Sequence, residues 1–238
     1  MSIFSKEELV RYSRQLSLTE IGIAGQEKIK KAKVLVVGAG GLGCPLLQYL
    51  TGAGVGTIGI IDFDTVELHN LHRQILFSTE DVGKAKAIVT SEKLKKQNPH
   101  VNFIVFNEML SEGNAEKIIS LFDIVCDGSD NFLTRYISND TCVKLKKALV
   151  YGSIFKFEGQ LAVFNFNGSK NLRDFYPEPP NAEDVPNCSE VGVLGAVPGI
   201  IGTYMAAETI NVILGKTKMM NRLKTINFLS SEELILNY

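Results

Sequence analysis

The sequence predicts an α/β fold in which a Rossmann-like, mostly parallel sheet is flanked by helices. Short β-branched apolar runs, such as KVLVV (33–37) and TIGII (57–61), alternate with segments of helical spacing. A glycine-rich segment, 38–43, joins the first run to the first of these helices. The run EGQLAVFNF (158–166) alternates in the way typical of an antiparallel strand. We therefore expect a parallel core with an antiparallel extension and a long crossover loop.

The core of the fold is expected over residues 31–153, where strands and helices alternate. Residues 33–61 are predicted to form strand, tight turn, helix and strand, a βαβ unit with a right-handed crossover. Further strands are predicted at 101–106, 123–127 and 148–153. Helices are predicted at 42–50, 83–97, 115–121 and 131–147.

Segments on either side of this core complete a single predicted domain, 1–238. Residues 1–30 are predicted to form a helical arm, in which Ser5 and Glu8 are spaced as a capping box. Residues 167–199 are rich in Pro, Asn, Gly and acidic side chains and lack periodicity, so we interpret them as a crossover loop. An apolar helix near 198–214 and short strands near 223–228 and 232–236 are predicted to close the chain.

Composition and charge exclude several classes of protein. The chain has 238 residues, of which 45% are hydrophobic, with 25 basic and 26 acidic side chains. A net charge of -1 without a long basic block argues against nucleic-acid binding, which depends on neutralising phosphates. No stretch approaches about 18 uninterrupted apolar residues, and the amino terminus lacks the apolar core of a secretory signal. We expect a cytoplasmic protein that binds neither nucleic acid nor a membrane.

The four cysteines are widely spaced and form no CxxC pair. This pattern fits reduced thiols better than a disulfide framework or a zinc site. Cys44, Cys126 and Cys142 fall in predicted helices and strands, and we expect them to be small buried apolar residues. Cys188 falls in the predicted crossover loop.

Gly38, Gly40 and Gly43 match the pattern G-x-G-x-x-G between a predicted strand and a predicted helix. Because these positions lack side chains, backbone N–H groups at the helix amino terminus can meet a phosphate. Asp62, at the end of the next strand, lies where a carboxylate accepts hydrogen bonds from ribose hydroxyls. The motif alone leaves open a structural turn without a ligand, a dinucleotide site and an ATP site.

The segment 62–74 places Asp62, Asp64, Asn70, Arg73 and Gln74 beyond the carboxyl end of a parallel strand. Sites in open α/β sheets form at this edge. Cationic and amide side chains there suit phosphoryl or nucleotidyl transfer, in which charge develops, better than hydride transfer to a nicotinamide. Taken by itself, the segment is interpreted equally well as a solvated loop.

Two further motifs are predicted to reach the same edge. Lys86 opens a helix and can point back toward the sheet as a compact positive charge, although a surface lysine is the commoner case. Asp130 and Asn131 follow another strand. The carboxylate of Asp130 suits Mg²⁺, which prefers oxygen ligands and substrate phosphates. The alternative is that Asp130 caps the helix that follows it.

Seven segments stand in a fixed order along nearly the whole chain: RYSRQL, GAGGLGCP, DFDTVELHNLHRQ, GKAKA, DGSDNFLTR, EGQLAVF and VPNCSEVGVLGAVPGIIG. Together they resemble the ThiF/MoeB/HesA family of adenylyltransferases, which are relatives of ubiquitin-activating enzymes. One such string would be weak evidence, whereas seven in order at compatible spacing carry far more weight.

This resemblance implies a homodimer whose protomers use ATP and Mg²⁺ to adenylylate a ubiquitin-like sulfur-carrier protein, in thiamine thiazole or molybdopterin synthesis. The carrier's carboxyl-terminal Gly-Gly carboxylate attacks the α-phosphate, and pyrophosphate leaves. A carboxylate is already ionised near pH 7, so the reaction needs no general base. His69, His72 and His100 are accordingly interpreted as ordinary polar positions.

The resemblance also implies a role for each motif residue. Asp62 would hold the ribose, Gly41 would let the backbone approach the phosphates, and Asp130 would hold Mg²⁺. Arg14 would reach across the dimer as an arginine finger, although a surface arginine in a weak ion pair is the alternative. The implied catalytic residues are Arg14, Arg73, Lys86, Asp130 and Cys188, the last of them for acyl or sulfur transfer. The implied ATP-binding residues are Gly38, Gly40, Gly41, Gly43, Asp62, Asp64, Asn70, Arg73, Gln74, Lys86, Asp130 and Asn131.

The resemblance leaves the role of Cys188 open. A thiolate there would attack the acyl-adenylate or join sulfur transfer, and a loop cysteine without chemistry is an equal alternative. Many relatives carry two CxxC pairs that bind a structural zinc, and this sequence has none, so we predict no zinc site. It also shows no rhodanese-like segment, so we expect a separate protein to donate sulfur.

Three alternative functions remain open from the sequence. One is adenylation of another peptide or protein carboxyl terminus, which differs only in the carrier. A second is an NAD-dependent oxidoreductase, which would leave Arg73, Lys86 and Asp130 without a shared purpose. A third is a non-catalytic scaffold, which would bind the carrier without exchanging pyrophosphate.

Overall fold

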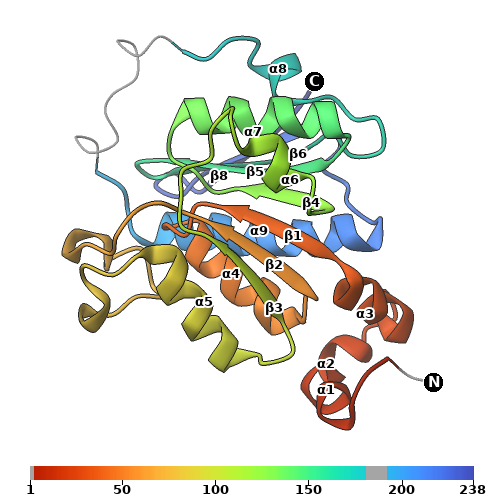
Figure 1. The fold of residues 1–238 in the computed structure, drawn as a ribbon. Coiled ribbons are helices and arrows are strands. Elements are labelled where there is room, and N and C mark those ends of the chain that lie inside the picture. The colour runs from red at the N-terminus through yellow and green to blue at the C-terminus, as the bar shows by residue number, and fades with distance from the viewer. Residues whose placement is uncertain (1–2, 181–191) are drawn as a thin grey trace.

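All strands of the described chain form one sheet. The computed structural model describes residues 3–180 and 192–238. In these residues eight strands lie in the order β3-β2-β1-β4-β5-β6-β7-β8 (Figure 1). The order 3-2-1-4-5 of the first five strands is that of a Rossmann-like, doubly wound sheet. The predicted fold class is therefore confirmed.

The parallel part of the sheet contains the strands that the apolar runs predicted. Val36 of β1, for example, lies opposite Ile60 of β2 on one side and Cys126 of β4 on the other. Both neighbours run parallel to β1, so the carboxyl ends of these strands meet at one edge. The five strands are β1 (Lys33–Val37), β2 (Thr57–Ile61), β3 (Asn102–Phe106), β4 (Ile124–Asp127) and β5 (Ala148–Phe155).

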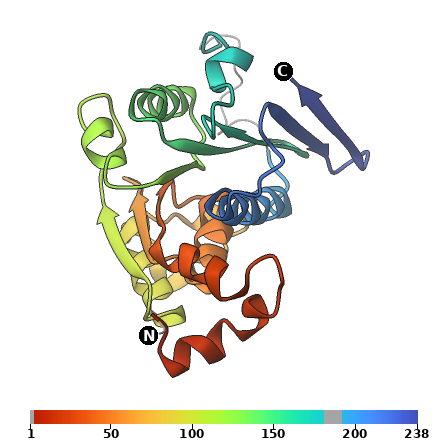
Figure 2. The same ribbon diagram turned by 90° about the vertical axis from the view of Figure 1, so that its right-hand side faces the viewer.

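The antiparallel extension continues the sheet beyond β5. β6 (Glu158–Phe164) pairs antiparallel with β5, and β7 (Arg222–Asn227) and β8 (Glu232–Asn237) follow in the same sense. Figure 2 shows β7 and β8, in dark blue, at the far edge of the sheet from β3. The antiparallel strand predicted near 158–166 is thus confirmed.

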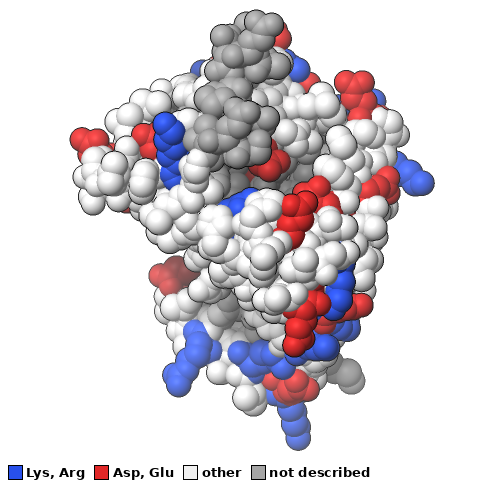
Figure 3. Space-filling model, turned by 90° about the vertical axis from the view of Figure 1, so that its left-hand side faces the viewer, with Lys and Arg blue, Asp and Glu red and all other residues white. Residues whose placement is uncertain are grey.

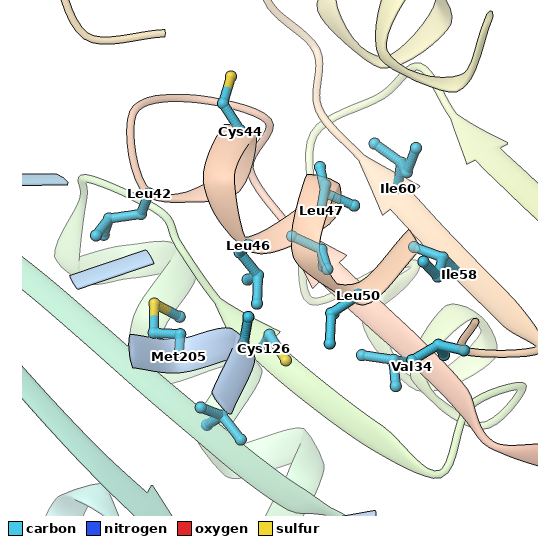
Figure 4. Close-up of a cluster of buried hydrophobic side chains, with 14 of the residues drawn as sticks. Val34, Leu42, Cys44, Leu46, Leu47, Leu50, Ile58, Ile60, Cys126 and Met205 are labelled. Carbon is cyan, nitrogen blue, oxygen red and sulfur yellow. The ribbon is translucent and has the colours of Figure 1, made fainter. Parts of the chain in front are cut away.

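Helices cover both faces of the sheet because its strands are apolar on both sides. In β1, Val34 and Val36 face one layer of helices, whereas Leu35 and Val37 face the other. Figure 4 shows the first of these cores, with Leu46 and other α4 side chains packed over the sheet. The first layer holds α4 (Gly43–Ala53), α5 (Lys86–Gln97) and α9 (Ala196–Leu214), and the second holds α6 (Ala115–Ile119), α7 (Phe132–Leu145) and α8 (Leu172–Phe175).

The helical arm before β1 differs from the prediction in being divided into three helices, α1 (Lys6–Arg11), α2 (Ser13–Leu16) and α3 (Gly22–Lys31). Tyr12 separates the first two with φ −95° and ψ 9°, and Gly22 has a positive φ of 54°. The Tyr12 hydroxyl accepts a hydrogen bond from Asn98, which lies just before β3. The arm therefore packs where the parallel strands begin.

The segment that was expected to be an irregular crossover loop, 167–199, contains regular structure at both ends. Asn171 caps the short helix α8 by accepting a hydrogen bond from the Arg173 backbone N–H. α9 begins at Ala196, inside the expected loop. By length and composition α9 is apolar enough to cross a membrane, but it packs against α4, β5 and β6 as a core helix of the sheet.

Candidate active site

A cavity of about 840 Å³ opens where β1, β2 and β4 end. Its volume lies within the usual range for small-molecule sites. The strand order reverses between β1 and β4, and ligands of open α/β sheets bind at such a switch point. Figure 3 shows this side of the molecule, with charged side chains of both signs around a hollow. Ten predicted site residues line the cavity: Gly38, Gly40, Gly41, Asp62, Asp64, Arg73, Gln74, Lys86, Asp130 and Asn131.

The glycine-rich loop between β1 and α4 depends on glycine at two positions. Gly38 has a φ of +88°, a conformation that side chains disfavour. A Cβ on Gly43 would lie 2.0 Å from the carbonyl oxygen of Gly38, so no other residue fits there. Gly43 does not line the cavity, which corrects its predicted role as a direct ligand-binding residue. It allows the turn that carries Gly40 and Gly41 to the cavity wall.

Asp62 follows β2 and is 8% exposed. Its Oδ2 accepts a hydrogen bond of 2.7 Å from the Ala39 backbone N–H, and its Oδ1 accepts one of 2.8 Å from the Asp64 N–H. Burial raises the pKa of this carboxyl, and the two N–H donors oppose that rise. Asp62 therefore holds the glycine-rich loop in place while it presents carboxylate oxygens to the cavity.

Lys86 is a buried lysine, 5% exposed, at the first position of α5. The helix begins three residues later than predicted because Ala85 pairs with Thr65 in a short antiparallel bridge. This pairing brings the Lys86 ammonium within 3.0 Å of the Asp64 carboxylate. The interpretation of Lys86 as an ordinary surface lysine is wrong, and its predicted approach to the sheet edge is confirmed.

The loop after β2 supplies Arg73 and Gln74. Arg73 Nη1 donates to the His69 carbonyl oxygen at 3.1 Å and lies 2.9 Å from His72 Nε2. Gln74 is buried, and its Oε1 has no hydrogen-bond partner among the described residues. His69 and His72 also line the cavity. The loop therefore brings a cation and an unpaired buried amide oxygen to the site.

Asn70 does not line the cavity, contrary to its predicted place beside the triphosphate. Its side chain is buried, and its Oδ1 accepts a hydrogen bond from the Glu67 backbone N–H at the start of the 3-10 helix η1 (Leu68–Asn70). The amide nitrogen lies 3.0 Å from His69 Nε2. Both polar groups of Asn70 are thus used to shape the loop that carries Arg73.

Asp130 and Asn131 follow β4 and take different roles. Asn131 Oδ1 accepts a hydrogen bond of 2.9 Å from the Thr134 backbone N–H and caps α7. The alternative in which Asp130 is the cap is therefore wrong. Asp130 is exposed and lines the cavity, on the opposite side of β1 from Asp62 and Asp64.

Arg14, a predicted catalytic residue, is not among the described residues that line the cavity. Arg14 lies in α2, next to Gln15, whose side chain donates to the carbonyl oxygen of Ala53 at the far end of α4. Arg14 is exposed and, within the described part of the chain, makes no hydrogen bond or ion pair. Cys188 lies outside the described residues.

The other three cysteines are buried, as predicted. Burial raises the pKa of the Cys44 and Cys126 thiols to about 12, and it also raises that of Cys142. Because the pKa values of these thiols lie far above neutral pH, the thiols are protonated and are poor nucleophiles.

Sequence reasoning missed a buried polar group beneath the cavity. Arg135 is 6% exposed and lines the cavity wall, with Ser129 beside it. Asp127, below them, is fully buried, and burial raises the pKa of its carboxyl. Arg135 belongs to the segment DGSDNFLTR, and its spacing of four residues from the cap Asn131 was the only signal that it lies on the first turn of α7.

Comparison with known proteins identifies the family. The model of the ThiF family matches residues 12–237. The chain belongs to the ThiF family. A sulfur carrier protein adenylyltransferase of Thermus thermophilus is 48% identical over 217 residues, which cover 89% of this chain and 80% of the relative.

Other ThiF-family relatives are longer than this chain. The adenylyltransferase and sulfurtransferase MOCS3 of Aedes aegypti is 49% identical over 217 residues, or 91% of this chain and 50% of the relative. A probable molybdopterin-synthase adenylyltransferase of Porphyra purpurea is 46% identical, over 92% of this chain and 57% of the relative. The chain thus spans about half the length of these two proteins.

Solved structures share the fold at low sequence identity. Escherichia coli MccB with ATP has a TM-score of 0.83 at 22% identity, covering 95% of this chain and 71% of MccB. PaaA has a TM-score of 0.82 at 20% identity, covering 100% of this chain and 75% of PaaA. The chain therefore shares the overall fold of MccB and PaaA.

Proposed function

We propose that this ThiF-family chain uses ATP to adenylylate the carboxyl-terminal Gly-Gly carboxylate of a ubiquitin-like sulfur-carrier protein. One observation carries the proposal: a glycine-rich loop, the cations Arg73 and Lys86, and the carboxylates Asp62 and Asp130 converge on one cavity. A relative 48% identical to this chain is named a sulfur carrier protein adenylyltransferase, which supports this choice of substrate.

The cavity fits ATP at its glycine-rich end. A Cβ on Gly40 would lie 3.7 Å from Gln74 Nε2, and a Cβ on Gly41 would lie 3.0 Å from Pro198 in α9. Backbone N–H groups in this loop and the amino terminus of the eleven-residue helix α4 favour a phosphate. Asp62 would accept hydrogen bonds from the ribose, while Arg73 and Lys86 would neutralise the triphosphate.

The reaction requires the protein to position the carrier carboxylate against the α-phosphate and to neutralise charge. A carboxylate oxygen of the carrier bonds to the α-phosphorus, the bond to the bridging oxygen breaks, and pyrophosphate leaves with its electrons. The attacking carboxylate is ionised near neutral pH, so no residue has to remove a proton. Arg73 and Lys86 would act by stabilising charge on the α-phosphate and the leaving group.

A magnesium ion fits the donor set of this cavity. Asp130 offers an exposed carboxylate at the cavity wall, and Mg²⁺ in nucleotide sites is held by one or two carboxylates together with phosphate oxygens. When bound, Mg²⁺ would offset negative charge on the phosphates. Lys86, on the same cavity, is paired with the Asp64 carboxylate at 3.0 Å.

A homodimer gives Arg14 a role in this proposal. The arm that carries Arg14 packs where the parallel strands begin, whereas the cavity lies where they end. Arg14 therefore acts on the nucleotide of a partner protomer, as an arginine finger supplied in trans. Cys188 would act after adenylylation, as an acceptor of the acyl group or a participant in sulfur transfer.

Thiamine thiazole and molybdopterin synthesis are the pathways proposed for this activity, in the cytoplasm and with a separate sulfur donor. Relatives named for molybdopterin synthase and MOCS3 support the second pathway. Membership of the ThiF family favours nucleotidyl transfer over the NAD-dependent alternative.

Carrier-dependent ATP–pyrophosphate exchange tests the proposal. The assay uses the full chain with Mg²⁺ and a panel of ubiquitin-like proteins that end in Gly-Gly, each alongside a version without the two glycines. We expect exchange only with the intact tails, and the best carrier indicates the pathway. Exchange with unrelated peptides but with no carrier would instead support adenylation of another carboxyl terminus.

A further inference from the structure

Arg135 is a buried cation that is anchored on two sides beneath the cavity. Its Nη1 donates a hydrogen bond of 2.7 Å to the Tyr151 hydroxyl, and its Nη2 donates one of 2.8 Å to the carbonyl oxygen of Ser129. The guanidinium also lies 5.1 Å from the centre of the Tyr151 ring and 5.8 Å from that of Phe132. These contacts leave the guanidinium little freedom to move.

The Ser129 carbonyl belongs to the turn that carries Asp130 into the cavity. The Gly128 N–H donates to the Val37 carbonyl oxygen at 2.9 Å, which ties the turn to the end of β1. The Ser129 N–H and hydroxyl donate to Asp127 Oδ1 at 2.9 and 2.6 Å. Arg135 therefore completes a set of bonds that fixes the backbone on the amino-terminal side of Asp130.

The same turn touches the glycine-rich loop. A Cβ on Gly38 would lie 3.1 Å from the Gly128 carbonyl oxygen, so the two backbones are in direct contact. A shift of residues 128–130 would therefore disturb both the carboxylate of Asp130 and the loop that faces the phosphates. Two parts of the site therefore depend on where this turn lies.

Asp127 lies below the turn, where the Arg135 guanidinium acts on it only through its electrostatic field. It is fully buried, and its Oδ2 has no hydrogen-bond partner within the described residues. A buried carboxyl oxygen without a hydrogen-bond partner costs folding free energy, so its presence calls for a reason other than stability. Holding the turn at the cavity floor is such a reason.

We propose that Arg135 is a positioning residue that sets the place of the Asp130 carboxylate through the Ser129 carbonyl. The inference rests on the proposed function in one respect, the use of Asp130 to hold Mg²⁺ with ATP. Arg135 does not touch the reacting atoms in this account. Its effect is on how tightly the metal–nucleotide complex is held.

Arg135→Lys is the variant that tests this role. Lysine keeps the positive charge over Asp127 but offers a single nitrogen, which cannot hold Tyr151 and Ser129 with the same planar fork. The matched control is Arg173→Lys, because Arg173 bonds Asp140 at 2.8 Å through two nitrogens but lies outside the cavity. Tyr151→Phe is a second variant, which frees Arg135 Nη1 without changing any charge.

The measurement is the binding of a fluorescent ATP analogue to each protein without carrier, first in excess EDTA and then across a Mg²⁺ titration. Thermal unfolding of each protein is measured alongside. We expect Arg135→Lys to raise the Mg²⁺ concentration for half-maximal binding by about 10–100-fold, the range seen when outer contacts of metal ligands are removed. Tyr151→Phe should change it in the same direction. Arg173→Lys should leave it unchanged, and binding in EDTA should change little in all three variants.

Two results would overturn the inference. One is a folded Arg135→Lys protein whose Mg²⁺ requirement equals that of the wild type. The other is an equal loss of binding with and without Mg²⁺, which would make Arg135 a direct nucleotide ligand or a general support of the fold. Failure of the proposed function looks different, because the wild-type chain itself would then bind no nucleotide or would not need a carrier for exchange.

Discussion

Arg73 is the residue whose removal affects the proposed reaction most directly. Its guanidinium lines the cavity and is held by the His69 carbonyl, so it is poised for a developing negative charge. We expect Arg73→Ala to lower carrier-dependent exchange by about 10²–10³-fold, the loss typical of one electrostatic donor. Steady-state exchange rates together with thermal unfolding measure this. Unchanged exchange by a folded variant would show that Arg73 is wrongly assigned.

Cys188 is expected to separate two steps of the proposed pathway. Cys188→Ala should leave adenylylation nearly unchanged, because a thiol has no part in carboxylate attack on the α-phosphate, and should abolish any covalent adduct between this chain and the carrier. Exchange assays and non-reducing electrophoresis measure the two steps. Equal loss of both would instead mean that Cys188 supports the site structurally.

Residue-level prediction succeeded for the position of side chains that follow a strand or open a helix at the sheet edge. Asp62, Lys86 and Asp130 were expected at the sheet edge and line the cavity there. Asn70 was assigned to the same cavity, but its side-chain oxygen accepts a hydrogen bond from the Glu67 backbone N–H. Sequence spacing does not show such competition, because it depends on the turn geometry of the loop.

Among the elements, the helical arm depends on a local capping interaction. The Ser5 hydroxyl accepts from the Glu8 N–H at 3.2 Å, and Glu8 Oε2 accepts from the Ser5 N–H at 2.9 Å. Burial raises the pKa of the Glu8 carboxyl, but hydrogen bonds from Lys30 and Ser5 outweigh this and hold it below its ordinary value. The charged form of Glu8 therefore stabilises the folded chain.

The sign of this shift sets a pH dependence for the Glu8→Gln variant. A carboxyl whose pKa is lower in the folded chain than in the unfolded chain stabilises the fold when it is charged. This stabilisation is fully present above the unfolded pKa of 4.5, and it is lost as the pH falls through the folded pKa. We expect Glu8→Gln to lower the free energy of unfolding by about 1 kcal/mol at pH 7, with the difference vanishing toward pH 3. Urea unfolding across this range measures it, with Glu112→Gln as an exposed control. A difference that is constant with pH would contradict the assignment.

Prediction of elements was most accurate for the buried strands. β1 and β2 have the predicted bounds because continuous β-branched runs fit a sheet that is covered on both faces. The start of α5 and the division of the arm were not foreseen. Both are set by contacts between distant segments, the pairing of Thr65 with Ala85 and the bond from Asn98 to Tyr12, which a local pattern does not contain.

At the scale of the whole molecule, the proposed function requires a second protomer to supply Arg14. We expect Arg14→Ala and Asp130→Asn each to be nearly inactive alone. Mixed and allowed to exchange subunits, they should recover about a quarter of the wild-type activity, because a mixed dimer contains one intact site. Exchange assays on the mixture, with mass measurement of the mixed dimers, test this. Mixed dimers without recovered activity would contradict the trans role of Arg14.

The central claim is tested most directly by the intact mass of the carrier after brief incubation with this chain, ATP and Mg²⁺. The account predicts that AMP is added to the carrier's carboxyl terminus, that the addition needs the final Gly-Gly, and that pyrophosphate reverses it. Addition to a carrier without the two glycines, or no addition by a chain that demonstrably binds ATP, would contradict the account.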